Sequence, residues 1–219
     1  MSAWTGSEVK TIGAAWREFR AKRAPWVIGA AIAGALVARL IIGEFGWRDL
    51  VAVAFMTVVY PFGEWAIHVQ LLHLKPFRCR GRTVELPTAA AHREHHEHPE
   101  RLDLVNFSPR EALAILCLAV PVTAAPLALV LPLGPVVSAV VTAYVLVGAY
   151  EWTHFLIHTA HRPRSRYYRS IWRNHRLHHF KNEHYWHGIT NTVSDRVLGT
   201  LRDQREVPRS PTARTLRES

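Results

Sequence analysis

Four long stretches of this chain are almost free of charged residues, and they constrain its fold more than any other feature. They cover residues 26–43, 50–74, 112–133 and 135–157. Each is close to the roughly 20 residues that an α-helix needs to cross a bilayer. Inside lipid the backbone must satisfy its own hydrogen bonds, which favours helices. The sequence therefore predicts an all-α integral membrane protein with four transmembrane helices. A soluble bundle with long core helices is the alternative.

Basic residues are distributed unevenly around these stretches. The first 25 residues, the 75–110 connection and the chain after His158 are rich in Arg and Lys, whereas the connection between the last two stretches has none. Basic residues accumulate on the cytoplasmic side of a membrane. We therefore expect both termini and the 75–110 segment in the cytoplasm. The net charge of +10 then indicates contact with lipid headgroups rather than nucleic acid, for which the sequence has no motif.

Three consecutive segments follow from this pattern. Residues 1–25 form a cytoplasmic N-terminal segment, residues 26–205 form the membrane domain, and residues 206–219 are predicted to be a disordered tail because they are rich in Arg, Ser, Thr and Pro. The N-terminal segment alternates basic residues with large apolar ones, which is typical of an amphipathic helix on a membrane surface. A solvated leader is the alternative. The apolar residues are Trp4, Val9, Ile12, Trp16 and Phe19.

Ten of the fourteen histidines form four clusters near the ends of the apolar stretches. Two clusters are pairs and two are HxxHH triplets. Their members are His68 and His73; His92, His95 and His96; His154 and His158; His175, His178 and His179. In the expected topology all of them lie on the cytoplasmic side. Imidazole is a common metal ligand, so we expect a histidine-rich helical cap that holds metal.

The spacing within the clusters predicts more than one metal ion. Residues i, i+3 and i+4 lie near one another on a helix, so each HxxHH presents three imidazoles within about one turn. His68 and His73 are five residues apart, about 140° around an ideal helix. Either the helix ends there or the two serve different metals. A catalytic zinc takes three protein ligands, so ten imidazoles predict two ions.

Two glutamates accompany the histidine pairs. Glu64 and Glu151 each begin a Glu-Trp dipeptide, about one helical turn before His68 and His154. We expect each carboxylate to accept an N–H from a ligand histidine; an ordinary helix-end acid in water is the alternative. A metal pair at headgroup level is within reach of a lipid tail, which suits oxidation of an unactivated C–H bond. Such oxidation needs oxygen and a redox metal, and imidazoles suit iron.

The motif set HxxxxH, HxxHH, HxxxH and HxxHH resembles the fatty acid hydroxylase and sterol desaturase superfamily of integral-membrane di-iron enzymes. The resemblance runs from about Glu64 to Thr200 and is closest in look to small bacterial fatty acid hydroxylase-like members. It includes HHEHP and the segment GITNTVSDRVLGT, residues 188–200. It implies two iron ions held by the ten histidines, with zinc as a substitute after purification. His161 and His187 match no ligand position clearly.

The resemblance implies a lipid monooxygenase that uses O2, most simply one that hydroxylates or desaturates a fatty acyl chain. Carotenoid or sterol substrates are alternatives. Because the chain has no GxGxxG turn, we expect a separate electron donor, either a reductase or a small carrier. A group of arginines is a candidate dock for an acidic carrier, unless it only holds the helix at the membrane. They are Arg162, Arg164, Arg166, Arg169 and Arg173.

A membrane metal-ion transporter or metal-binding protein is the alternative from another class. A transporter is expected to place ionisable ligands near the middle of its spans. Here the spans are apolar at mid-depth and the histidines gather at one end. The sequence therefore favours the enzyme.

Overall fold

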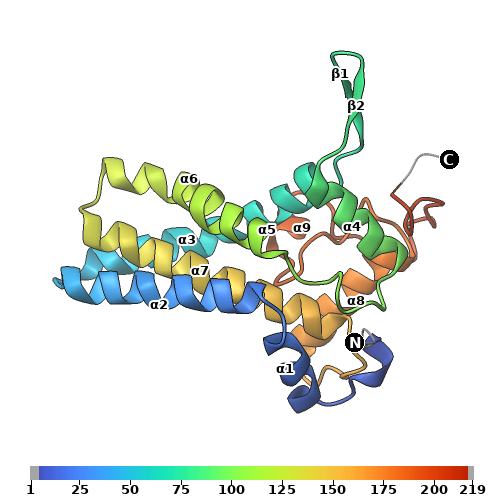
Figure 1. Ribbon diagram of the computed structural model, residues 1–219, viewed down its shortest axis with the longest axis horizontal. Helices are drawn as coiled ribbons and strands as arrows, with labels where there is room; N and C mark the ends of the chain where they lie inside the picture. The colour runs from blue at the N-terminus through green and yellow to red at the C-terminus, as the bar shows by residue number, and fades with distance from the viewer. Residues whose placement is uncertain (1–4, 217–219) are drawn as a thin grey trace. The chain divides into compact units, whose positions relative to one another are not determined.

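The computed structural model describes residues 5–216 (Figure 1). Parts of the predicted N-terminal segment and tail, residues 1–4 (including Trp4) and 217–219, lie outside the described residues. The chain forms two compact units. The span unit comprises Trp16–Tyr60 and Asn106–Trp152, and the histidine unit comprises Met1–Ala15, Pro61–Val105 and Thr153–Ser219. This division by contact does not follow the three consecutive segments expected from the sequence.

Four helices are long and apolar enough to cross a membrane, as the sequence predicts. They cover Ala24–Ile42, Trp47–Leu72, Pro109–Leu129 and Leu133–Ile157. The first is α2 (Ala24–Ile42) and the last is α7 (Leu133–Ile157). The second joins α3 (Trp47–Ala66) to the π-helical turn η2 (Ile67–Leu72). The third is α5 (Pro109–Ala114), a π-helical turn η3 (Ile115–Ala119), α6 (Val120–Ala124) and a 3₁₀ turn η4 (Ala125–Leu129).

The span unit is packed inside by small and aliphatic side chains and is apolar outside. Ala52, Ala112, Ala139 and Ala143 are almost fully buried, and small residues of this kind let membrane helices approach closely. Large aliphatic side chains point outward, and only three of the 19 residues of α2 are buried. The most exposed include Leu40, Ile41, Leu50, Leu118 and Val122. Such faces suit lipid rather than water, which disfavours the soluble bundle.

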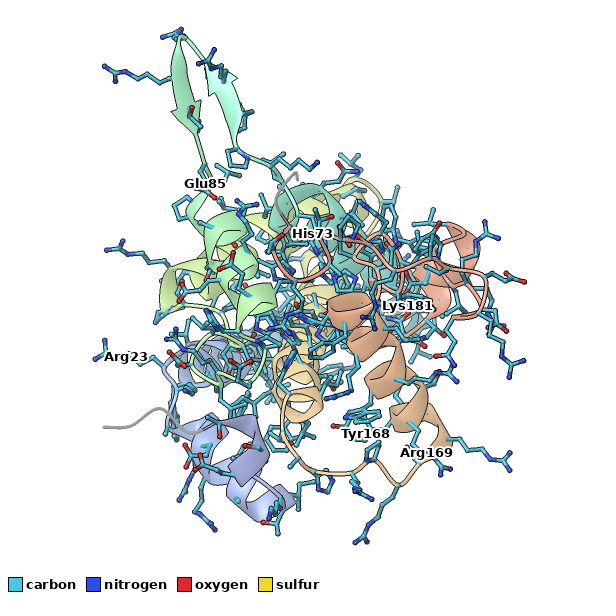
Figure 2. The ribbon with its side chains drawn as sticks, turned by 90° about the vertical axis from the view of Figure 1, so that its right-hand side faces the viewer. Arg23, His73, Glu85, Tyr168, Arg169 and Lys181 are labelled. Carbon is cyan, nitrogen blue, oxygen red and sulfur yellow. The ribbon has the colours of Figure 1, made fainter. Side chains whose placement is uncertain are left out.

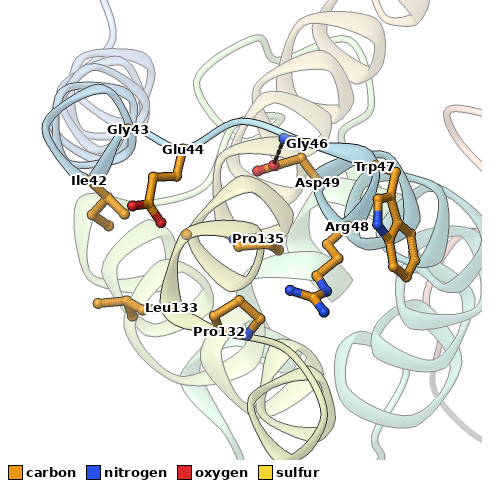
Figure 3. A pocket seen from close by; sticks show the side chains of 11 residues that line it. Ile42, Gly43, Glu44, Gly46, Trp47, Arg48, Asp49, Pro132, Leu133 and Pro135 are labelled. Atoms are coloured by element: carbon orange, nitrogen blue, oxygen red, sulfur yellow. Dashed lines mark hydrogen bonds between the residues drawn. The ribbon is translucent and has the colours of Figure 1, made fainter.

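A buried ion pair fixes one end of the span unit. Arg39 Nη2 lies 2.6 Å from Asp49 Oδ1, and Arg39 Nε donates to Ser138 Oγ at 2.8 Å. The Ser138 hydroxyl in turn donates to Asp49 at 2.6 Å. Because both charges are paired and hydrogen-bonded, their burial is tolerated. A pocket of about 380 Å³ lies beside this network, between the connections Ile42–Asp49 and Pro132–Pro135 (Figure 3). No histidine is among its lining residues.

The histidine unit is built on two helices, α4 (Pro87–Glu97) and α8 (Arg166–Phe180). Pro87 opens α4 at a position where the missing N–H costs nothing. Ser165 caps α8 by accepting the Tyr168 N–H at 3.0 Å. The unit also contains the short elements η1 (Gly6–Glu8) and α9 (Val193–Val197).

A two-stranded hairpin is the one departure from the all-α prediction among the described residues. Strands β1 (Phe77–Cys79) and β2 (Arg82–Val84) pair antiparallel, with Arg78 opposite Thr83. The two turn residues, Arg80 and Gly81, both have positive φ angles, as two-residue hairpin turns require. The hairpin projects from the start of α4 (Figure 1). The rest of the fold confirms the all-α membrane prediction.

The terminal segments are structured where the chain is described. Helix α1 (Ile12–Arg20) is amphipathic, because Ile12 and Trp16 are exposed while Phe19 is buried. Its place on a cytoplasmic leaflet stays a prediction. Residues 207–216 differ from the expected disordered tail, because Val207, Ala213 and Leu216 are buried. These three apolar residues lie among polar ones, so the average composition of the tail did not indicate that part of it is buried.

Candidate metal centre

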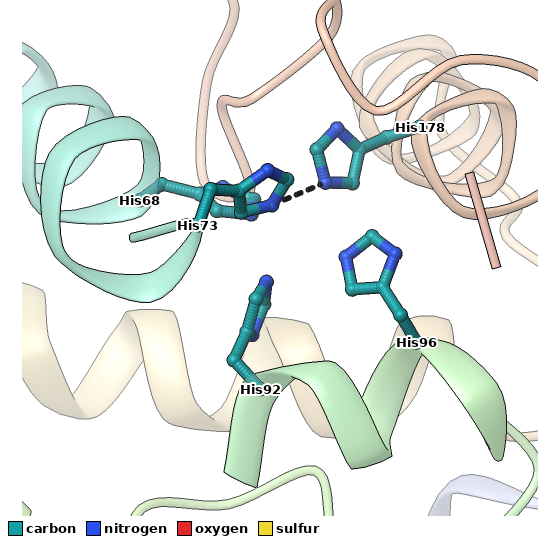
Figure 4. A group of neighbouring side chains, drawn as sticks. All are labelled: His68, His73, His92, His96 and His178. Carbon is teal, nitrogen blue, oxygen red and sulfur yellow. Dashed lines mark hydrogen bonds between the residues drawn. The ribbon is translucent and has the colours of Figure 1, made fainter. Parts of the chain in front are cut away.

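The structure gathers the ten clustered histidines into two groups of five. Within each group, one ring nitrogen per residue lies within 4.8 Å of all the others. The first group is His68, His73, His92, His96 and His178 (Figure 4). The second group is His95, His154, His158, His175 and His179. Eight of the rings are buried and two, His73 and His158, are partly buried. All ten belong to the histidine unit.

Each HxxHH helix contributes to both groups, in opposite proportions. In α4, the i and i+4 residues His92 and His96 join the first group and His95 joins the second. In α8, the i and i+4 residues join the second group and His178, at i+3, joins the first. Residues i and i+4 are about 40° apart on a helix, whereas i+3 lies about 60° to the other side. One helix turn can therefore supply ligands to two neighbouring sites.

A π-helical turn resolves the five-residue spacing of His68 and His73. The His73 N–H donates to the His68 carbonyl at 3.2 Å, closing an i→i+5 turn. Residues five apart in such a turn are nearly one full turn apart, so both rings lie on one side. They belong to the same group, which disfavours the alternative that they serve different metals. The helix also ends at His73, as the other alternative proposed.

The second group has an arrangement that hydrogen bonding alone does not explain. His175 Nε2 lies 3.2 Å from His154 Nε2 and 3.0 Å from the Nε2 atoms of both His158 and His179. A neutral imidazole nitrogen carries either one proton or one lone pair, so it cannot bond well to three others. Nitrogens that share an ion at 2.0–2.1 Å are themselves about 3 Å apart. The distances fit a shared cation.

The first group also fits a shared cation, and here a different observation supports it. His73 Nε2 and His178 Nε2 are 3.2 Å apart (Figure 4). Within the described chain, Nε2 of His68, His92 and His96 is buried and meets no hydrogen-bond partner. A buried polar atom without a partner is costly. An ion at the centre of the group would satisfy all three atoms.

Backbone carbonyls accept hydrogen bonds from Nδ1 of several rings and so fix the orientation of those rings. Nδ1 of His68 donates to the His187 carbonyl at 2.7 Å, and Nδ1 of His178 donates to the Tyr185 carbonyl at 2.8 Å. The same bond, at 2.8 Å, joins His96 to Ala213 and His158 to Pro99. A proton fixed on Nδ1 leaves Nε2 free to bind a metal.

Burial keeps the rings neutral, which is the form that binds metal. Loss of hydration lowers the pKa of His96 to about 4 and that of His158 to about 3. It also lowers the pKa of His175 and His179 well below the ordinary value, with the neighbouring rings adding repulsion.

The two glutamates bind loops rather than histidines. Glu64 accepts the N–H groups of Ile189 at 2.5 Å and Thr190 at 2.9 Å, and also the Thr190 hydroxyl. Glu151 accepts Asn106 Nδ2 at 2.9 Å and the Phe107 N–H at 3.2 Å. In the structure both carboxylates accept hydrogen bonds from loop residues, whereas the sequence predicted ligand histidines as the donors. Buried backbone N–H groups need acceptors, and these carboxylates provide them. Both glutamates are buried, which also rules out an acid exposed to water.

The 186–200 loop holds the His187 carbonyl in place behind His68. Asp195 accepts the N–H groups of His187 at 2.9 Å and Gly188 at 2.8 Å, and the Thr200 hydroxyl at 2.6 Å. Burial alone would raise the pKa of Asp195, but these donors more than offset it and lower the pKa. A Cβ on Gly188 would lie 2.0 Å from the Asn191 carbonyl oxygen, so the turn requires glycine.

The remaining candidates lie outside both groups. The His187 ring is buried but belongs to neither group, and His161 is only partly buried. Sequence reasoning did not single out Asp195, although it lies within the quoted segment GITNTVSDRVLGT. It did not single out Asn106 or Ala213, which no motif marks. The five arginines of the predicted dock are exposed, and Arg169 points away from α8 (Figure 2).

A pocket of about 290 Å³ reaches the second group. Its lining includes His158 and His179, with Glu100, Ala160 and Arg176 beside them. The second group therefore has an opening large enough for a small molecule or a side chain.

Comparison with known proteins agrees with this geometry. The fatty acid hydroxylase family model matches residues 53–200, which is more than half of the chain. The chain belongs to the fatty acid hydroxylase family. The match contains all ten histidines of the two groups but ends before Ala213.

Two dihydroceramide fatty acyl 2-hydroxylases of Arabidopsis thaliana are similar to this fatty acid hydroxylase family member. FAH2 is 27% identical over 157 residues, covering 68% of the chain and 60% of the relative. FAH1 is 28% identical over 162 residues, covering 70% and 62%. The chain thus spans about three fifths of the length of these relatives.

The solved hydroxylase domain of Scs7p has the same fold. The TM-score is 0.61 at 20% sequence identity, over 86% of this chain and 70% of that one.

Proposed function

We propose that this chain is a membrane hydroxylase that oxidises a C–H bond of a fatty acyl chain in a lipid, using metal ions held by the two histidine groups. The observation that carries the proposal is the convergence of five imidazoles at each of two buried points. Membership of the family and similarity to proteins named as fatty acyl 2-hydroxylases support the acyl substrate. They favour it over a carotenoid or a sterol, and favour an enzyme over a transporter.

We assign the ten histidines as ligands, five to each of two iron ions. Iron, when bound, supplies the oxygen and one-electron chemistry that no side chain provides. The chain's own contribution is to keep the rings neutral by burial, to fix the proton on Nδ1 through carbonyls, and to limit water around the site. Glu64 acts one step further out, by fixing residues 189–190 of the loop whose His187 carbonyl accepts from His68. Glu151 fixes Asn106 and Phe107.

The reaction needs partners. Hydroxylation converts a C–H bond, O2, two electrons and two protons into an alcohol and water. Two external electrons are therefore consumed per cycle, and we infer a separate reductase or small electron carrier. An acidic carrier would meet the exposed arginine group of residues 162–173 by charge complementarity. The four apolar helices support an integral membrane protein, and the distribution of basic residues supports cytoplasmic termini and a cytoplasmic metal site.

Metal analysis tests the ligand assignment first. Full-length protein purified gently in detergent and loaded with Fe²⁺ is expected to hold close to two ions per chain. Replacing both HxxHH motifs with alanine should abolish binding, whereas His98→Ala, an exposed histidine outside both groups, should leave it unchanged. Two ions retained after the double motif replacement would contradict the assignment.

Lipid mass spectrometry tests the reaction. Cells with the protein are expected to accumulate acyl chains that are 16 Da heavier than those of cells without it, the mass of one added oxygen atom. With the purified protein, product beyond one turnover should require a reductase system. Repeated turnover without any electron source would contradict an oxygenase.

A further inference from the structure

The C-terminal segment Val207–Leu216, called the strap below, is bound to the end of α8. The Ser210 N–H donates to the Lys181 carbonyl at 2.8 Å, and Asn182 Nδ2 donates to the Pro208 carbonyl at 3.1 Å. The buried carboxylate of Glu183 accepts the Ser210 hydroxyl at 3.0 Å and the Thr212 hydroxyl at 2.5 Å. These contacts attach the first half of the strap to three consecutive residues, 181–183.

The second half of the strap is bound to the end of α4. Arg214 Nε donates to the His96 carbonyl at 3.0 Å, and Arg214 Nη2 donates to the Glu97 carbonyl at 2.5 Å. The last carbonyls of a helix have no partner within it, so a guanidinium there satisfies acceptors that would otherwise need water. Ala213 is buried, and its carbonyl accepts His96 Nδ1 at 2.8 Å. The strap thus joins the ends of the two helices that contribute to both histidine groups.

His96 depends on the strap in a way that the other rings of its group do not. The carbonyls behind His68 and His178 come from residues 185–187, inside the segment that the family model matches. The carbonyl behind His96 comes from Ala213, beyond that segment. Without it, the buried Nδ1 would lose its acceptor and the ring could exchange its proton to Nε2, the atom that faces the group.

We propose that the strap is a positioning element of the first metal site, which orients His96 through the Ala213 carbonyl and is itself anchored beside His96 through Arg214. This inference rests on the proposed function, because it takes His96 as a ligand. It adds residues outside the family match to the machinery of the site. It also makes the two groups unequal, because the strap carbonyl that accepts from a histidine ring, that of Ala213, accepts from a ring of the first group.

The test is metal binding by a chain that ends at Glu206, compared with the full chain in the same detergent. We expect the shortened chain to retain about one ion and to bind the other about 10–100-fold more weakly, the usual loss when a group behind a ligand is removed. The visible absorption of the Co²⁺-loaded protein should lose the contribution of one site and keep that of the other. Two ions held with unchanged affinity and spectrum would overturn the proposal.

A point variant decides the matter if the shortened chain does not fold. Arg214→Gln should weaken the first site, Arg214→Lys should restore part of the affinity, and Arg205→Gln, an exposed arginine just before the strap, should change nothing. If His96 is the route, adding Arg214→Gln to His96→Ala should cause no further loss of affinity. Equal loss at both sites would reject positioning through His96. Failure of the full chain itself to bind metal would instead reject the proposed function.

Discussion

The two histidine groups have the same number of rings but are supported differently. In the first group, three rings donate to loop carbonyls, those of Tyr185, His187 and Ala213, whereas in the second group His158 donates to the carbonyl of Pro99. In the second, four rings come from two helices and their immediate ends, and three Nε2 atoms converge on that of His175. The strap hydrogen-bonds to a ring of the first group through the Ala213 carbonyl, whereas a pocket borders the second group. The first site should therefore depend on loop structure and the second on helix packing.

The largest expected effect is the loss of one site by replacing its central ring. His175→Ala removes the nitrogen that three others approach, so the second site should lose its ion. Activity should fall by at least about 100-fold, beyond the range for groups behind the ligands. His178→Ala should have the matching effect on the first site. Metal content and product formation are the measurements.

The distinction between two separate metal sites would be contradicted if the two variants lost the same ion, or if each lost both ions. That result would mean a single cooperative cluster rather than two sites. His184→Ala is the control, since that ring is exposed and in neither group.

Acid should destabilise the ion-free protein through a property that both groups share. The pKa of His96 lies near 4 because the ring is buried, against about 6.5 in the unfolded chain. Between these values the unfolded chain binds more protons, so stability falls as pH falls from about 6.5 to about 4. One such ring contributes about 3 kcal/mol over that range.

Thermal unfolding in detergent with a chelator, followed across this pH range, is the measurement. His96→Gln should flatten the dependence and His184→Gln, at an exposed site, should not. A stability that did not change between pH 6.5 and pH 4 would show that the rings are not buried in neutral form.

A loop variant should separate the two sites. Asp195→Asn replaces one of the two accepting oxygens with an NH2 group, which cannot accept, so the His187 or Gly188 N–H loses its partner. The His187 carbonyl should shift, and the first site should bind its ion about 10–100-fold more weakly. The second site should be unaffected.

Site-resolved titration with Co²⁺ is the measurement, and Asp203→Asn, which changes an exposed carboxylate, is the control. Equal weakening of both sites would remove the distinction drawn between loop support and helix support.

Sequence patterns predicted the framework of this site because charge-poor stretches and histidine spacing are local properties. Four spans and ten clustered histidines followed from such patterns alone. The assignment of rings to groups did not, because it depends on the π-helical turn at Ile67–Leu72 and on how α4 faces α8. The partners of Glu64 and Glu151 were also missed, since backbone N–H groups of loops leave no mark in the residue types.

The strap shows a further limit of composition. Its Arg, Ser, Thr and Pro content predicts disorder, yet in the structure those residues make specific bonds: Ser210 and Thr212 to Glu183, and Arg214 to the end of α4. Whether a polar segment orders depends on acceptors elsewhere in the chain. Those acceptors are Glu183 and helix-end carbonyls, whose availability only the fold determines.

The smallest expected effect concerns the opening at the second group. Ala160 is exposed and lines the pocket of about 290 Å³ that reaches His158 and His179. Ala160→Trp would place a large ring in that space without replacing a residue of either group. A narrower opening slows passage but leaves the bound state alone, so removal of the second ion by a chelator should slow several-fold while its affinity is unchanged. The first ion, which the pocket does not reach, should leave at the original rate, and Ala160→Ser should match the parent chain. If the chelator removed both ions more slowly by the same factor, the pocket would not be a route to one group alone. The proposed difference in access between the groups would then be wrong.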